Sequence, residues 1–154
     1  MNRGDFMQYG CNRTNAAATI KGNVENPMLR GQASFVQKRN GVLVTVKLSG
    51  LPKTSDKGFF ALHIHEGEGC EGKDFAETQG HYNPEDEPHP SHAGDLPPLL
   101  SCNGSAYISV LTNRFRIADI IGKTIVIHSD ADDFRTQPSG NSGKKIACGI
   151  IRIS

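Results

Sequence analysis

The stretch Val42-Leu-Val-Thr-Val-Lys-Leu48 decides the fold, because its side chains alternate with a period of two. Neighbouring residues of a β-strand project from opposite faces, so the valines and Leu48 share one face. Runs of the same kind occupy residues 18–22, 32–37, 59–65, 106–112, 124–128 and 146–153, and turn signals such as Asn40-Gly41 separate them. The sequence therefore predicts an antiparallel sandwich or barrel of seven or eight short strands.

Two long stretches, residues 67–100 and 129–145, do not show the strand pattern. Loops of this length in a compact domain are usually functional, and both stretches adjoin histidines. Residues 114–122 are predicted to include a helical turn. We divide the chain into a polar, irregular lead-in at residues 1–15 and a single domain at residues 16–154.

Composition excludes some partners and leaves the compartment open. The net charge of +1 gives no electrostatic reason to expect a nucleic acid or a membrane as partner. No stretch approaches the roughly 20 apolar residues of a membrane span. The start of the chain lacks the apolar run of a signal peptide, and the retained Met1 favours a cytoplasmic location. The alternative is an exported protein whose leader has been removed, because the four cysteines permit a disulfide.

All six histidines lie between His63 and His128. Side chains two residues apart project from the same face of a strand, so His63 and His65 point one way and their neighbours point into the core. Val126 and His128 share a face in the same manner. If these two strands are neighbours, three imidazoles converge, and imidazole is the commonest protein ligand for zinc and copper. Taken alone, the His63–His65 pair would more often be two surface residues.

A second group follows in the segment His89-Pro-Ser-His92-Ala-Gly-Asp95. It supplies two imidazoles and one carboxylate, and a tetrahedral divalent ion would need one more ligand. His81 is the upstream candidate for that ligand. The alternative interpretation is a polar turn, because prolines and Gly94 favour turns in any case.

These motifs resemble those of the copper/zinc superoxide dismutases, in particular their bacterial branch. The matching segments are His63-Ile-His-Glu66, Gly80-His-Tyr-Asn-Pro84, His92-Ala-Gly-Asp-Leu96, Val126-Ile-His128, Gly140-Asn-Ser-Gly143 and Ala147-Cys-Gly149. The resemblance implies an all-β fold, a Greek-key antiparallel β-sandwich or flattened barrel of about eight strands with two long functional loops.

The resemblance also implies a role for each site residue. Copper is expected to bind His63, His65, His81 and His128, and zinc is expected to bind His81, His89, His92 and Asp95. His81 would bridge the two metals as an imidazolate and handle a proton during catalysis. Asp132 would accept hydrogen bonds from His63 and His89 and couple the two sites. Cys70 and Cys148 would form a disulfide, whereas Cys11 and Cys102 are expected to be free or packed thiols.

The chain departs from the family pattern at Lys145, where the family has an arginine at the mouth of the site. Lysine keeps the charge that attracts superoxide but loses the planar fork of a guanidinium, so we expect activity to be reduced. The neighbouring Lys144 either shares this role or is solvated. Ser139 stands where the family often has a threonine that lines the channel.

Both long loops also look shorter than those of many members of the family. Only two residues separate His89 from His92, which puts the geometry of the zinc site in question. The stretch from Glu66 to Glu87 is rich in acids, and it could repel an anion if it borders the channel.

The activity implied is the dismutation of superoxide to dioxygen and hydrogen peroxide, with superoxide as substrate and copper and zinc as cofactors. The alternative is a non-catalytic dismutase-like protein that binds zinc or buffers copper. A homodimer is among the assemblies compatible with the resemblance, which does not fix the oligomeric state.

Overall fold

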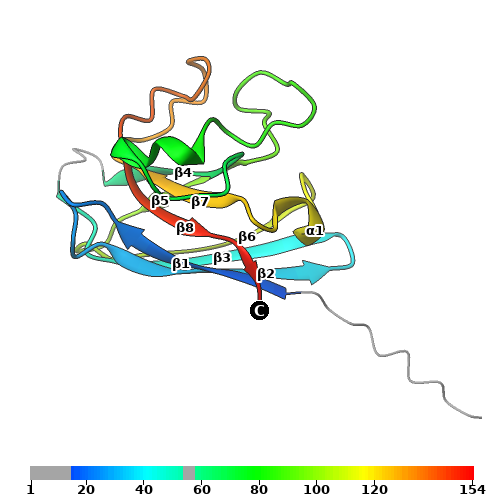
Figure 1. Cartoon of the computed structure of the whole chain (residues 1–154), viewed down its shortest axis with the longest axis horizontal. Coiled ribbons are helices and arrows are strands. Elements are labelled where there is room, and N and C mark those ends of the chain that lie inside the picture. The colour runs from blue at the N-terminus through cyan, green and yellow to red at the C-terminus, as the bar shows by residue number, and fades with distance from the viewer. Residues whose placement is uncertain (1–14, 54–57) are drawn as a thin grey trace, which may run out of the picture.

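Nine antiparallel strands form a nearly closed barrel in the computed structural model, which describes residues 15–53 and 58–154 (Figure 1). The strands are β1 (Asn15–Gly22), β2 (Arg30–Lys38), β3 (Gly41–Ser49), β4 (Phe59–His65), β5 (Asp95–Leu100), β6 (Ala106–Thr112), β7 (Thr124–His128), β8 (Lys145–Ile150) and β9 (Arg152–Ile153). The all-β prediction is confirmed. Of the predicted lead-in, only Asn15 lies within the described residues, where it begins β1; Cys11 lies outside them.

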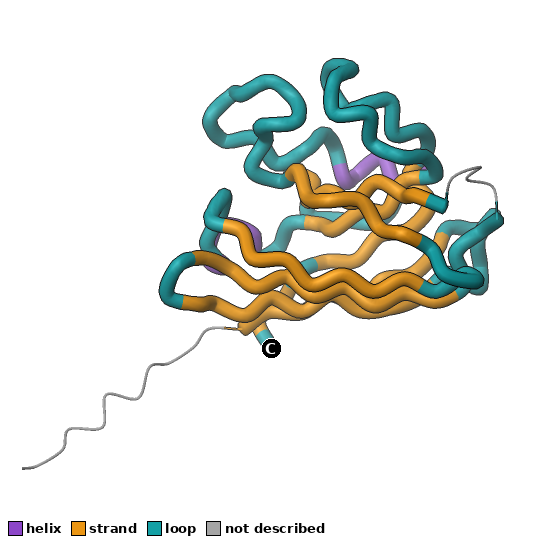
Figure 2. The backbone as a smooth tube through the Cα atoms, turned by 180° about the vertical axis from the view of Figure 1, so that it is seen from behind, coloured by secondary structure: helices purple, strands orange, loops and turns teal. Residues whose placement is uncertain are grey.

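Hydrogen-bonded neighbours follow the order β5-β4-β7-β8-β1-β2-β3-β6, and β9 pairs with β1. Strands β1, β2 and β3 are sequential hairpin neighbours. Strand β4, the next along the chain, is not a neighbour of β3 in the sheet, and β6 pairs with β3 instead. This strand order is the Greek-key arrangement that the resemblance implied. Figure 2 shows the strands from behind, with the loops at one side of the barrel.

The alternating pattern buries one face of each strand. Val42, Val44 and Val46 on β3 are fully buried, as the sequence predicted. On β4 and β7 the opposite face is buried as well, including His63, His65 and His128. Two long loops lie over this side of the molecule, away from β1, β2 and β3 (Figure 1). The histidines are therefore enclosed between the barrel wall and the loops.

The prediction of a strandless stretch up to residue 100 was wrong, because Asp95–Leu100 forms β5. This segment contains Pro97 and Pro98, which cannot donate hydrogen bonds to a sheet. They are tolerated because β5 is at the end of the strand order and pairs only with β4. Leu96 and Leu99 of β5 are buried in the core.

Helical structure is sparse. The predicted helical turn is present as α1 (Ile117–Ile120), and a 3₁₀ helix, η1 (Lys73–Thr78), interrupts the first long loop. Among the described residues no helix has both the length and the apolar character needed to cross a membrane.

Candidate metal centre

The first long loop, residues 66–94, folds back onto the end of β4. The backbone N–H of Glu66 donates to Gly80 at 2.9 Å, and that of Ile64 donates to Gly94 at 2.8 Å. These bonds place His81 in a β-bridge with His65. A side chain at Gly94 would put its Cβ 2.2 Å from the carbonyl oxygen of Ile64, so the close approach requires glycine.

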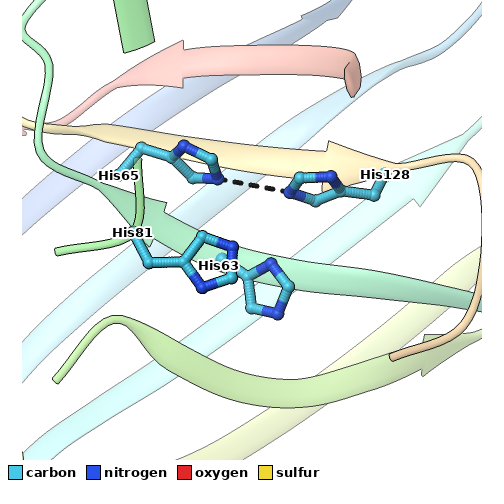
Figure 3. A group of neighbouring side chains, drawn as sticks. All are labelled: His63, His65, His81 and His128. Carbon is cyan, nitrogen blue, oxygen red and sulfur yellow. Dashed lines mark hydrogen bonds between the residues drawn. The ribbon is translucent and has the colours of Figure 1, made fainter. Parts of the chain in front are cut away.

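Four histidines meet where β4 and β7 lie side by side. The strands pair as the sequence argument required, and the first loop adds a further ring beside them (Figure 3). The Nε2 atoms of His65 and His128 are 3.2 Å apart, and the ring centroids of His63 and His81 are 4.0 Å apart. One potential ligand atom from each residue lies within 4.8 Å of the others in the group His63, His65, His81 and His128.

A second group shares His81 with the first. The Nδ1 atom of His81 is 2.8 Å from Oδ1 of Asp95 and 3.2 Å from Nδ1 of His92. The Nδ1 atom of His89 is 3.0 Å from Oδ2 of Asp95. The members of this group are His81, His89, His92 and Asp95. The two groups that the sequence predicted are thus brought together with His81 between them.

Neighbouring acceptors fix which nitrogen of three rings carries a proton. The Nδ1–H of His65 donates to the carbonyl of Gln79 at 2.8 Å. The Nε2–H groups of His63 and His89 donate to the two carboxylate oxygens of Asp132 at 2.7 and 2.8 Å. The other nitrogen of each ring is therefore unprotonated and faces the other potential ligands of the same group. This arrangement is typical of metal-binding histidines.

Buried nitrogens without partners show that the donor set fits metal ions. Within the described part of the chain, the buried histidine nitrogens that have no hydrogen-bond partner are Nδ1 of His63, His89 and His128 and Nε2 of His81. Such orphan atoms are costly unless something else satisfies them. The 3.2 Å separations match the edge of a tetrahedron whose metal–nitrogen bonds are about 2.0–2.1 Å, an edge of about 3.3 Å. The residues therefore fit two divalent ions, one with four nitrogens and one with three nitrogens and an oxygen.

Burial favours the neutral form of three histidines of the first group, His63, His65 and His128. It lowers the pKa of His65 and of His128 well below the ordinary value, and it lowers the pKa of His63 despite the opposing hydrogen bond to Asp132. Burial alone would raise the pKa of Asp132, but hydrogen bonds from His63 and His89 outweigh it and hold that pKa at about 2. Unprotonated imidazoles beside an ionised carboxylate are the forms in which these groups act in a metal site.

A cavity of about 410 Å³ opens onto the first group. Its lining includes His65, His81, His128, Ser139 and Lys145. The stretch from Glu66 to Glu87 borders the cavity through Gln79, Gly80, His81 and Asn83, but none of its acids is among the lining residues. Lys144 is exposed and lies outside the lining as well.

Lys145 is tied to the first loop. Its Nζ donates to the hydroxyl of Thr78 at 2.7 Å and to the carbonyl of Gln79 at 3.0 Å. Burial lowers the pKa of Lys145. Two of the three ammonium hydrogens are thus used by the protein, and one is left for the cavity. Sequence reasoning missed Thr78 and Gln79, because neither belongs to a motif and each acts on a residue far away in the chain.

The Cys70–Cys148 disulfide joins the first loop to β8, as predicted. Among the described cysteines, Cys102 has a free, exposed thiol.

Comparison with known proteins places this geometry in a family. Residues 29–151 match the family model described as copper/zinc superoxide dismutase. The chain is 33% identical over 145 residues to a Cu-Zn superoxide dismutase of Aquifex aeolicus, covering 84% of this chain and 82% of that protein. It is 35% identical over 143 residues to a Cu-Zn superoxide dismutase of Deinococcus radiodurans, covering 79% and 76%. The solved structure of a SOD-like protein from Bacillus subtilis superposes with a TM-score of 0.73 at 27% identity, covering 87% of this chain and 96% of that one.

Proposed function

This chain belongs to the copper/zinc superoxide dismutase family, and from that premise we propose that it dismutates superoxide. Two superoxide anions and two protons would give one dioxygen and one hydrogen peroxide. The observation that carries the proposal is the pair of ligand groups that share His81, with a cavity and a cation beside the first group. Because an imidazole has two ring nitrogens, His81 can be a ligand in both groups at once.

The donor chemistry supports copper in the first group and zinc in the second. Four imidazoles suit copper, and three imidazoles with one carboxylate suit a closed tetrahedral zinc site. When bound, copper would supply one-electron oxidation and reduction of superoxide, whereas zinc has no redox chemistry.

His81 is the residue proposed to handle a proton. Its Nδ1 faces Asp95 and His92, and its Nε2 is the atom directed to the first group. Because Nδ1 is engaged, Nε2 is the nitrogen that can accept a proton and release it toward peroxide. Asp132 would keep the rings of His63 and His89 oriented from behind.

Lys145 is proposed to draw the anion in and hold it. Among the residues that line the cavity it is the one lysine or arginine, and the lining contains no carboxylate. The ammonium has one free hydrogen, so it would hold superoxide through a single hydrogen bond. A guanidinium could form two such bonds.

The test is direct measurement of superoxide decay with the copper- and zinc-loaded protein. We expect a second-order loss of superoxide far above the spontaneous rate. The control variant is His128→Gln, which removes one residue of the first group and none of the second. Loaded wild-type protein that holds copper and leaves superoxide decay unchanged would refute the proposal.

A second candidate function is metal buffering without turnover. It is favoured by the replacement of the family's arginine by Lys145, most of whose hydrogen bonds are made within the protein. In that case the same experiment would show full metal binding and no superoxide consumption.

A further inference from the structure

Two side chains outside the ligand set hold the backbone of the zinc loop, which we define as residues 83–95. They are Gln137 in the second long loop, residues 129–144, and Arg114 in the segment after β6. We infer that both are positioning residues that preorganise the zinc ligands. The inference rests on the proposed zinc site and goes beyond it, because neither residue contacts a ligand atom.

Gln137 forms hydrogen bonds with both the backbone N–H and the backbone carbonyl of His89. Its Oε1 accepts from the backbone N–H of His89 at 2.9 Å, and its Nε2 donates to the His89 carbonyl at 2.7 Å. The carboxamide thus pairs with His89 as a neighbouring strand would. A turn of the His89 backbone would break both bonds, so the direction in which the imidazole leaves the chain is fixed.

Arg114 gathers three carbonyls of the same loop. Its Nη1 lies 2.9 Å from the oxygen of Pro90, 3.0 Å from that of His92 and 3.3 Å from that of Asp95. The guanidinium is permanently charged, and hydrogen bonds from a charged donor are among the stronger ones. Next to it Phe115 is buried, so the arginine extends from a segment that the core holds in place.

The ligands need such support because their metal-facing atoms repel one another. The Nδ1 atoms of His89 and His92 lie 3.0 and 3.3 Å from the same oxygen of Asp95. Without a cation or a shared proton between them, these electron pairs repel one another, although the backbone N–H of His92 donates to that same oxygen at 3.0 Å. Gln137 restrains the loop at His89, and Arg114 restrains it at His92 and Asp95. Zinc then binds a loop that is already ordered, and less binding free energy is lost in ordering it.

The experiment measures the zinc dissociation constant of the full chain by competition with a chromophoric chelator. Gln137→Met and Arg114→Met remove the hydrogen bonds but keep an unbranched side chain of similar reach. We expect each to raise the dissociation constant about 10- to 100-fold, and Arg114→Lys to recover part of the loss. Arg116→Met is the matched control, because the Arg116 side chain pairs with Asp119 and not with the zinc loop.

Thermal unfolding of the metal-free proteins separates positioning from a general loss of fold. A weakened zinc affinity in a variant whose metal-free form still unfolds cooperatively supports the inference. Zinc affinities within two-fold of wild type in both methionine variants would overturn it, as would an equal loss in Arg116→Met. Absence of zinc binding by the wild-type protein would instead refute the metal assignment under the proposed function.

Discussion

The ammonium nitrogen of Lys145 lies 2.7 Å from the hydroxyl oxygen of Thr78, a residue with no exposed surface. The same hydroxyl donates to the carbonyl of Phe75 at 2.8 Å, so its orientation is fixed. The one lysine of the cavity is therefore held by a buried hydroxyl as well as by a carbonyl.

Thr78→Val should weaken this hold at nearly constant volume. Loss of a hydrogen bond of about 1 kcal/mol corresponds to roughly a five-fold slower reaction with superoxide, if the bond matters mainly for placing the cation. The rate constant is measured by pulse radiolysis on metal-loaded protein. Thr78→Ser, which keeps the hydroxyl, should react at close to the wild-type rate; equal slowing in both variants would show that the hydroxyl is not the reason.

Two substitutions separate the effect of the charge of Lys145 on the reaction rate from the effect of its shape. Lys145→Met should lower the rate constant by about ten-fold at low salt and flatten its dependence on ionic strength, because the attraction of the anion is lost. Lys145→Arg keeps the charge, adds the planar fork of a guanidinium and should at least equal wild type. Lys144→Met, a change at the exposed neighbour, is the control. A steep salt dependence that survives in Lys145→Met would place the attracting charge elsewhere.

Asp132→Asn should loosen both metal groups at once. An amide has one accepting oxygen, so only one of His63 and His89 can keep its hydrogen bond in the same form. We expect the affinity for each metal to fall about 10- to 100-fold, measured by chelator competition. The control is Asp133→Asn, since Asp133 bonds within its own loop to Thr136 and Arg135. Unchanged affinities in Asp132→Asn would mean that the carboxylate does not couple the groups.

Removal of the disulfide should lower global stability. Cys70 and Cys148 are separated by 78 residues. Closing a loop of that length is expected to lower the entropy of the unfolded chain by an amount worth roughly 4–5 kcal/mol. The double variant Cys70→Ser/Cys148→Ser should lose about that much free energy of unfolding in urea, whereas Cys102→Ser should lose little. A loss under 1 kcal/mol would contradict the entropic account.

Ionisation of Asp119, which lies outside the metal groups, should make the free energy of unfolding depend on pH. The side chain of Arg116 and its backbone N–H both bond to this carboxylate and lower its pKa below 3.8. Because the folded state prefers ionised Asp119, the stabilisation is complete above the unfolded pKa and disappears as the pH falls through the folded one. Arg116 is largely exposed and solvent screens the pair, so the difference between wild type and Asp119→Asn should stay below about 1 kcal/mol near pH 7. Urea titrations from pH 7 to pH 2.5 measure it; a difference that grows toward low pH would contradict the assignment.

Local periodicity was sufficient to predict much of the fold and the core of the site. The direction of His63 and His65 depends only on the alternation of a single strand, and Val126 and His128 follow the same rule. The convergence of these side chains requires β4 and β7 to be neighbours, and the two strands are paired in the structure. The membership of His81 in both groups came from the family resemblance, because spacing alone does not show which loop returns to which strand.

What the sequence could not show depends on contacts between distant segments. Pro97 and Pro98 argue against a strand, and only the position of β5 at the end of the sheet makes them acceptable. Arg114 and Gln137 bond to carbonyl and N–H groups that every residue possesses, so no pattern of side chains identifies their partners. Thr78 meets Lys145 only after the first loop has folded back onto the barrel.

The disulfide and the Lys145–Thr78 hydrogen bond join the same two segments. Cys70 and Thr78 belong to the first loop, and Cys148 and Lys145 belong to β8. The covalent bond therefore acts as a short tether that sets a high effective concentration of the Thr78 hydroxyl at the ammonium. Reduction of the disulfide would lower that effective concentration without changing a metal ligand. The thiol–disulfide balance of the surroundings would then affect the placement of Lys145, the cation proposed to hold superoxide.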